Sequence, residues 1–266
     1  MEDPTRDQPG ALTSLLLRNA GFEHAFFTRQ GGVSEAPWAS LNFASSTGDD
    51  PAAVRENLAR AARRLGVDPA RVYFLSQVHG VASRELDGTE DRDAVVREEG
   101  DITLSKVAGV ACGARSADCV PILAGDRKTG AVAAIHSGWR GTVLRVALEG
   151  VRRLREIAGP AAELVAAIGP HIEVCCFEVG DDVAGELAGC SPVGRAAIWE
   201  GEGKKPRVEL RRVVRAQLME AGLRPSDIDD VAGCTVCDAE RFHSFRRDGA
   251  RSGRMLSAIV AKGAVR

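Results

Sequence analysis

Short apolar segments alternate with polar turns along much of the chain, and the clearest pair lies near its middle. Residues 120–124 and 131–135 are largely apolar, and the polar residues 125–130 between them begin and end with glycine. Two runs this short around such a turn predict a β-hairpin. If the hairpin closes symmetrically near residue 127, Cys119 lies directly opposite His136. Directly opposed residues have Cβ atoms roughly 4.5–5.5 Å apart, so these two side chains would meet.

Other segments predict further strands and helices. Runs typical of strands are residues 23–28, 71–78, 107–112, 164–168 and 228–236. Apolar residues at helical spacing, or helix-start signals such as Asp50-Pro51, predict helices over residues 51–65, 143–158, 182–187 and 210–223. The charged stretch 85–100 is interpreted as a solvated loop.

These elements intermix without a clear linker. We therefore expect a mixed α/β (α+β) fold in a single domain, residues 16–266. Residues 1–15 start with a polar, proline-containing stretch that lacks the basic start and apolar run of a signal peptide. They are interpreted as a disordered lead-in.

Composition narrows the class of protein. The chain has 266 residues, 44% of them hydrophobic, and a formal net charge of −2. This charge gives no general attraction to nucleic acid or to anionic membranes, and no apolar run is long enough for a membrane span. Seven cysteines, an odd number in a chain without an export signal, favour reduced thiols and a cytoplasmic location.

The predicted hairpin suggests a metal site. A thiolate from Cys119 and an imidazole from His136 are ligands suited to zinc. His79, at the end of the predicted strand 71–78, could supply a third ligand. Three protein ligands and one open position are typical of catalytic rather than structural zinc. Each residue alone also fits an ordinary packing role, so spacing leaves both interpretations open.

The remaining cysteines give weaker signals. Cys234-x-x-Cys237 could belong to a zinc knuckle, but no second ligand pair follows it, and His243 is the only later candidate. The adjacent Cys175 and Cys176 are sterically awkward as a disulfide. All four are interpreted as reduced, mainly structural thiols. Arg246, Arg247, Arg251 and Arg254 are interpreted as a solvated basic face.

Several short motifs together resemble one known family. They are FTRQGGVS at residues 27–34, SLN at 40–42, GDDP at 48–51, QVHG at 77–80, GD at 100–101, ADCVP at 117–121, HSGWRG at 136–141, IGP at 168–170, CCFEVG at 175–180 and CTVCD at 234–238. This set is similar to the YfiH-like laccase-domain proteins. That family was first described as multicopper polyphenol oxidases and is now regarded as zinc-dependent purine nucleoside phosphorylases with adenosine deaminase activity. The chain departs from it at His243, where an aromatic or small residue is more usual.

The resemblance implies a fold of mixed sheets with flanking helices, and one Zn²⁺ per chain bound by His79, Cys119 and His136. It also implies that adenosine, inosine and guanosine, with methylthioadenosine as a further candidate substrate, react with phosphate to give the base and the sugar 1-phosphate. The small-molecule partners are thus a nucleoside and phosphate, and the oligomeric state stays open.

Roles within the site follow as hypotheses. The substrate- and phosphate-binding residues are Arg29, Asn42, Gln77 and Arg140, with the N-terminus of the helix after Arg140 also facing the phosphate. Asp118 is either a catalytic acid/base or a residue that orients the site. Cys119 is a metal ligand or, without a metal, a nucleophile with a histidine base.

Three other functions are weighed against this one. They are a cysteine hydrolase, a cell-wall precursor quality-control factor and a copper-dependent polyphenol oxidase. Copper is the weaker cofactor candidate because a multicopper centre needs many histidines and the chain has five, at positions 24, 79, 136, 171 and 243.

Overall fold

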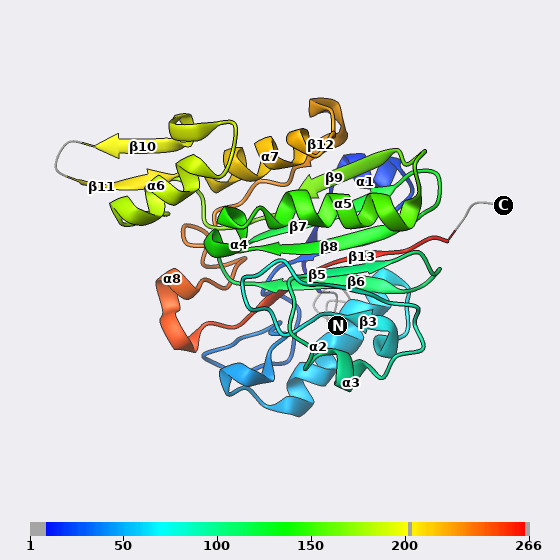
Figure 1. Cartoon of the computed structure of the whole chain (residues 1–266). Coiled ribbons are helices and arrows are strands. Elements are labelled where there is room, and N and C mark those ends of the chain that lie inside the picture. Colours follow the sequence, from blue (N-terminus) through cyan, green and yellow to red (C-terminus); the bar gives the residue numbers. More distant parts are fainter. Residues whose placement is uncertain (1–8, 202–203, 264–266) are drawn as a thin grey trace.

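The fold consists of two main β-sheets packed face to face, with helices on both outer sides (Figure 1). The computed structural model describes residues 9–201 and 204–263. This arrangement confirms the predicted mixed α/β fold class with mixed sheets and flanking helices.

The first sheet has five strands in the order β1-β2-β13-β6-β3. Their bounds are β1 Ala11–Leu12, β2 His24–Phe27, β13 Met255–Val260, β6 Ala111–Ser116 and β3 Val72–Tyr73. Helix α2 (Pro51–Leu65) covers the outer face, where its Leu58 and Leu65 share a buried cluster with Phe27 and Leu256.

The second sheet has six strands in the order β12-β9-β7-β8-β5-β4. Their bounds are β12 Ile228–Asp230, β9 Leu164–Ile168, β7 Val120–Asp126, β8 Val132–Ser137, β5 Ile102–Ser105 and β4 Ser83–Glu85. Helices α5 (Val146–Ala158) and α7 (Leu210–Glu220) cover its outer face through residues such as Leu154 and Leu218.

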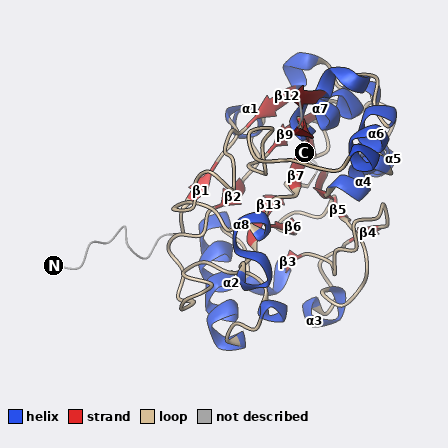
Figure 2. Ribbon diagram, turned by 90° about the vertical axis from the view of Figure 1, so that its left-hand side faces the viewer, coloured by secondary structure: helices blue, strands red, loops and turns tan. Residues whose placement is uncertain are grey.

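The two sheets share an apolar interior. Successive side chains of a strand point to opposite faces, so β7 directs Ile122 toward the helices and Leu123 toward the other sheet. Leu123 lies in one buried cluster with Phe26 and Tyr73 of the first sheet. Figure 2 shows the same molecule after a 90° turn, with α5, α6 and α7 at the upper right and α2 and α3 at the bottom.

The remaining elements are short. The helices are α1 Leu15–Asn19, α3 Arg92–Val95, α4 Trp139–Val143, α6 Asp181–Gly189 and α8 Phe245–Asp248. Strands β10 (Ile198–Gly201) and β11 (Lys204–Val208) form a separate antiparallel pair that projects from the molecule in Figure 1. No helix in the described part of the chain is both long and apolar enough to cross a bilayer.

Predicted elements with strong local signals are confirmed. Asp50 caps α2 by accepting a hydrogen bond from the Ala52 amide (2.9 Å), and Pro51 occupies the first turn. The predicted strands 23–28 and 164–168 are found as β2 and β9, and the predicted helices 182–187 and 210–223 as α6 and α7.

The boundaries of one predicted helix and one predicted strand are wrong, and the structure shows why. The predicted helix 143–158 is divided into α4 and α5, because Arg145 between them has a left-handed backbone (φ 65°). The predicted strand 107–112 starts later as β6, because residues 107–110 form a turn closed by the Val110 amide and the Val107 carbonyl (3.1 Å).

Two predicted strands are too long, and several strands of the structure were not predicted. The segment 71–78 forms only β3, after which the Ser76 amide bonds to Glu98 (2.9 Å) instead of continuing the ladder. The segment 228–236 ends as a strand at Asp230 and continues as a loop. Strands β1, β4, β5 and β13 and the β10–β11 pair were not predicted.

The predicted lead-in ends earlier than residue 15. Residues 1–8 lie outside the described part, but Ala11 and Leu12 form β1 by pairing with Phe27 and Phe26. Ser14 is fully buried and caps α1. The disorder predicted for residues 11–15 is therefore wrong, because this segment completes the edge of the first sheet.

Candidate active site

The hairpin that suggested the site has a different register from the predicted one. In the β7–β8 ladder Pro121 is opposite His136, so Cys119 lies one residue before the strand, level with Gly138. The prediction that Cys119 directly opposes His136 is therefore wrong by two residues. A shift of two keeps both side chains on the same face of the sheet, because side chains alternate with a period of two.

The cause of the shift lies in the turn. The Asp126 carboxylate accepts hydrogen bonds from the amide (2.8 Å) and hydroxyl (2.7 Å) of Thr129. These bonds start the turn after Asp126 rather than at Gly125, and β7 is two residues longer than predicted.

The three predicted metal ligands nevertheless converge. One ligand atom from each of His79, Cys119 and His136 lies within 4.8 Å of the other two. The sulfur of Cys119 is 3.7 Å from His79 Nε2, and the two imidazole rings are 5.1 Å apart between centroids. A thiolate and two imidazoles form a donor set that suits zinc and leaves one position open.

Asp101, directly before β5, organises this group, although no role was predicted for it from the sequence. Its Oδ1 is 2.8 Å from His136 Nδ1, so Nε2 is the ring atom left for a metal. The same carboxylate accepts hydrogen bonds from the amides of His79 (3.0 Å) and Gly80 (2.7 Å). A carboxylate behind a histidine ligand fixes its tautomer and orientation. The antiparallel pairing of β5 with β8, which places Asp101 beside His136, is the signal that would have identified it.

Two residues of the site have left-handed backbones. His79 has φ 62° and Asp118 has φ 92°, both unusual for residues other than glycine. Such conformations persist where the surroundings fix them and are frequent at functional sites. Here they turn the chain sharply at both segments that bring ligands to the cluster.

Electrostatics couple the ligands. Burial raises the pKa of the Cys119 thiol, but His136 and His79 outweigh it and lower that pKa to about 6. Burial lowers the pKa of His136, whereas the Cys119 thiolate and Asp101 raise it to about 9. Without a cation, the pair is therefore a thiolate beside an imidazolium. A metal would displace the imidazolium proton, because a histidine ligand must be neutral.

Asp118, next to Cys119, is buried and engaged on both oxygens. Thr235 donates its hydroxyl to Oδ1 (2.6 Å), and the amide of Arg246 donates to Oδ2 (2.6 Å). These bonds tie the segment that carries Cys119 to the loop and helix α8 that follow β12. They favour the orienting role among the two considered from sequence.

A cavity of about 530 Å³ opens beside the cluster. Its lining includes the three residues of the cluster, four arginines and three aromatic residues. The arginines are Arg115, Arg140, Arg246 and Arg254, and the aromatic residues are Trp139, Phe177 and Phe245. Asp118 is the one carboxylate among the described residues that line it. The cavity therefore suits an anion together with a flat apolar group.

The structure separates the four predicted substrate-binding residues into two pairs. Gln77 and Arg140 line the cavity. Gln77 exchanges two hydrogen bonds with the Arg115 backbone (2.6 and 2.8 Å), and the exposed Arg140 lies over the Trp139 ring at 4.6 Å.

Arg29 and Asn42 do not line the cavity. The Arg29 guanidinium donates to the carbonyls of Ala39 (2.8 Å) and Ala239 (3.2 Å). Asn42 is fully buried and holds the Arg254 amide through its Oδ1 (2.8 Å). Both residues support loops, and Asn42 contacts the cavity wall through the backbones of Arg254 and Ala44.

The basic residues near the end of the chain were predicted to form a solvated face, but two of them contribute to the cavity. Arg246 and Arg254 line the cavity, because α8 and the segment after it fold over the site. Arg246 donates to the carbonyls of Cys176 (3.2 Å) and Glu178 (3.0 Å). Local sequence could not reveal this, because the loops that hold Arg246 lie some 70 residues earlier.

Comparison with known proteins decides the family. The family model described as "Multi-copper polyphenol oxidoreductase laccase" matches residues 23–262. The chain belongs to this laccase family. Its similarity extends over nearly the full length of curated relatives. A purine nucleoside phosphorylase of Streptomyces coelicolor is 36% identical over 239 residues, covering 90% of this chain and 95% of the relative. Another from Deinococcus radiodurans is 36% identical over 257 residues, covering 94% and 93%.

Solved structures agree with the laccase-family assignment. YfiH of Bacillus licheniformis, described as a hypothetical protein, has a TM-score of 0.87 at 30% identity and covers 96% of this chain and 98% of its own. YlmD of Geobacillus stearothermophilus has a TM-score of 0.85 at 32% identity, covering 91% and 93%. The resemblance expected from the sequence motifs is thus confirmed.

Proposed function

We propose that this laccase-family chain is a zinc-dependent purine nucleoside phosphorylase with adenosine deaminase activity. The observation that carries the proposal is an arginine-lined cavity directly beside the His79, Cys119 and His136 cluster. The names of the curated relatives support it. A cytoplasmic location and the absence of a nucleic-acid partner, both expected from the sequence, belong to the same proposal.

Zinc fits the donor set, with His79, Cys119 and His136 as its ligands. When bound, it would supply Lewis-acid polarisation of a substrate oxygen or of water. Copper chemistry of the multicopper type has less support, because the other three histidines do not join the cluster. His24 bonds to the Ser14 amide (2.8 Å), His171 to the Gly169 carbonyl (2.8 Å), and His243 packs against Gly253.

The arginines would hold phosphate. In phosphorolysis, a phosphate oxygen bonds to ribose C1′ while the bond from C1′ to the purine nitrogen breaks, and the purine leaves with a proton. Arg140 has no ion pair within the described residues and is free to meet the phosphate, with Arg246 and Arg254 across the cavity. The helix N-terminus expected to assist contributes little, because α4 has only five residues.

Aromatic side chains would receive the base. Phe177 and Phe245 line the cavity, and Phe245 is 52% exposed, with the Arg254 guanidinium 5.6 Å from its ring centroid. A purine stacking there would cover it. Asp118 would keep Arg246 in place rather than transfer a proton. Deamination at the same site would add water at C6 of adenosine and release ammonia, giving inosine.

A product assay tests the proposal. Zinc-loaded protein with adenosine and phosphate should yield adenine, ribose 1-phosphate and inosine, and inosine, guanosine and methylthioadenosine should be tested as further substrates. Arg140→Ala should raise the KM for phosphate roughly 10- to 100-fold, as expected for loss of a charged hydrogen bond. Arg152→Ala, on the exposed side of α5, is the matched control and should leave the KM for phosphate unchanged. If metal-loaded protein forms none of the three products, the proposal is wrong.

One observation favours a second candidate, a cysteine hydrolase. The Cys119 thiolate beside the His136 imidazolium is a nucleophile–base pair of the kind found in such enzymes. The two functions respond oppositely to a chelator. A hydrolase would keep its activity without metal and lose it on alkylation of Cys119, whereas the phosphorylase would stop when zinc is removed.

A further inference from the structure

A second group of metal-ligand side chains lies outside the proposed active site. The sulfur atoms of Cys175, Cys176, Cys234 and Cys237 all lie within 4.8 Å of one another. Cys237 is 3.6 Å from Cys175 and 3.4 Å from Cys176, and Cys175 is 3.5 Å from Cys234. None of the four is in a disulfide. Four thiols thus converge on one point.

The topology of the sheet creates this convergence. Cys175 and Cys176 follow β9, and Cys234 and Cys237 follow β12, the parallel neighbour of β9. Parallel strands end at the same edge of a sheet, so the loops after them meet. A parallel bridge between His171 and Cys234 joins the two loops directly. A second ligand pair was expected only after Cys237, so the pair about 60 residues earlier in the chain was not predicted.

The sulfur separations match a single tetrahedral ion. A Zn–S distance of about 2.3 Å at tetrahedral angles places sulfur atoms about 3.8 Å apart. The three separations of 3.4–3.6 Å given above are close to this value, and far from the roughly 2.05 Å of a disulfide. The geometry points to a second, structural Zn²⁺ site formed by Cys175, Cys176, Cys234 and Cys237. Four protein ligands close it, unlike the open cluster in the active site.

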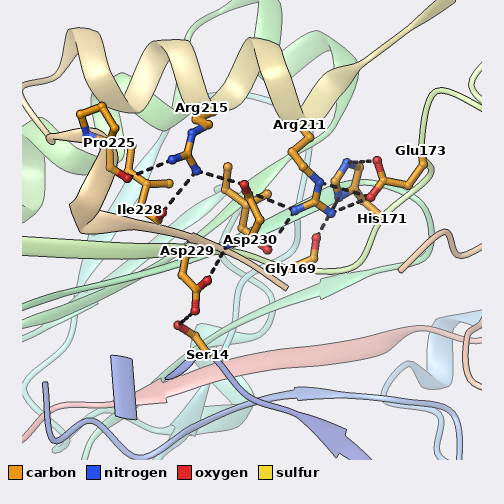
Figure 3. Close-up of polar contacts among 11 residues, drawn as sticks. Ser14, Gly169, His171, Glu173, Arg211, Arg215, Pro225, Ile228, Asp229 and Asp230 are labelled. Carbon is orange, nitrogen blue, oxygen red and sulfur yellow. Dashed lines mark hydrogen bonds and ion pairs between the residues drawn. The ribbon is translucent and has the colours of Figure 1, made fainter. Parts of the chain in front are cut away.

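The loop that carries the first pair is anchored before any metal binds. Arg211 of α7 pairs with Glu173 (2.6 Å) and with Asp230 at the end of β12 (3.3 Å), as Figure 3 shows. Arg215 pairs with Asp230 as well (3.0 Å). These contacts fix the start of the 171–177 loop against β12, so the cysteines are positioned at little further entropic cost.

Neighbouring arginines would balance the charge of the site. Four thiolates and one Zn²⁺ carry a net charge of −2. Arg246 donates to the Cys176 carbonyl (3.2 Å), and Arg247 donates to the carbonyls of Thr235 (2.8 Å) and Val236 (3.2 Å). Both guanidinium groups are therefore held at the backbone of the two cysteine pairs.

The second site would support the cavity wall. Thr235, next to Cys234, bonds to Asp118, and Phe177, next to Cys176, lines the cavity. Zinc bound to the four cysteines would hold the segments that carry these two residues at a fixed distance from each other. Its role is structural, and it would be present whether or not the chain is a phosphorylase.

Metal counting tests the site without substrate. Protein purified with reductant and zinc should contain two zinc ions per chain by mass spectrometry. Cys234→Ser/Cys237→Ser should contain one, as should His136→Ala, which removes the other ion. Cys190→Ser, at a half-buried cysteine outside both groups, should retain two. With Co²⁺ in place of zinc, the double variant should lose most of the sulfur-to-cobalt absorption.

Two results would overturn the inference. One is a wild-type protein that binds no more zinc or cobalt than the double variant under reducing conditions. The other is a disulfide among the four cysteines whose reduction does not lead to metal binding. The ion remaining at His79, Cys119 and His136 reports that the double variant is folded. If it does not fold, Cys237→Ser, at an exposed position, provides the same comparison with less disturbance.

Discussion

Asp101 is the residue on which the two histidines of the active site both depend. It accepts from the ring of His136 and from the amide of His79, so one carboxylate sets two ligands. Asp101→Asn preserves the shape but removes the charge and can present a donor where His136 needs an acceptor. We expect zinc affinity to fall roughly 10- to 100-fold, measured by competition with a chelator of known affinity.

Asp181→Asn is the control for this prediction. Asp181 is exposed in the first turn of α6, away from the cluster, and its substitution should leave zinc affinity unchanged. Equal affinity in wild type and Asp101→Asn would mean that the carboxylate only supports the backbone of the 78–80 loop.

Residue chemistry could be predicted from sequence where it followed a local pattern. Cys119 and His136 flank a hairpin, so their proximity was foreseeable even though the register was not. Asp101, Arg115 and Arg246 reach the site through pairings between distant segments. One sequence does not reveal such pairings, and these residues were missed for that reason.

At the scale of elements, the junction between β8 and α4 controls how closely the ligands approach. Gly138 caps α4 at this junction, and a Cβ atom there would clash with His79 Cδ2 and lie 3.0 Å from the Cys119 sulfur. Gly138→Ala should therefore push the His79 ring away and weaken metal binding, while circular dichroism and the melting transition show that the fold persists.

Gly185→Ala in α6 is the matched control. A Cβ at Gly185 has no neighbour within 4 Å, and alanine in a helix interior is expected to stabilise by about 0.5–1 kcal/mol without affecting the metal. If Gly138→Ala binds zinc as tightly as wild type, the junction tolerates a side chain, and crowding by His79 and Cys119 is not the reason for glycine at this position.

Elements were predictable when the chain marked its own boundaries. The start of α2 at Asp50 and Pro51 is such a case, and its end at Gly66, with a left-handed φ of 69°, is another. The break at Arg145 and the short length of β3 depend on contacts made elsewhere in the fold. Periodicity does not record those contacts, and the predicted elements there were too long.

At the scale of the whole molecule, buried histidines link stability to pH. Burial, with a contribution from Arg29, lowers the pKa of His243 to about 3. Burial likewise lowers the pKa of His171, to about 4, and of His24. An unfolded histidine has a pKa near 6.5, so between these values the unfolded chain binds more protons than the folded one. The contribution of these histidines to the free energy of unfolding is therefore fully present above about pH 6.5 and is lost progressively as the pH is lowered toward their folded-state pKa values.

His243→Phe should reduce this dependence. Urea unfolding of metal-free protein at pH 7.5 and 5.5 gives the free energy of unfolding at each pH. The loss between the two should be smaller in the variant than in wild type by roughly 1 kcal/mol, whatever the substitution costs overall. An unchanged loss would mean that His243 is not held neutral in the folded protein.

The position of β13 has a consequence for the order of assembly. This strand, residues 255–260, lies between β2 and β6 and is the partner that joins them. Without this strand the hydrogen-bonded ladder of the first sheet would be interrupted, with β1–β2 on one side and β6–β3 on the other. The bond between Asn42 and Arg254, and the part of the cavity wall that Arg254 forms, also depend on the placement of β13, because Arg254 directly precedes the strand. The proposed ligands His79, Cys119 and His136 are therefore all synthesised well before the strand that completes the wall of the cavity, so the site can close only after they have been made.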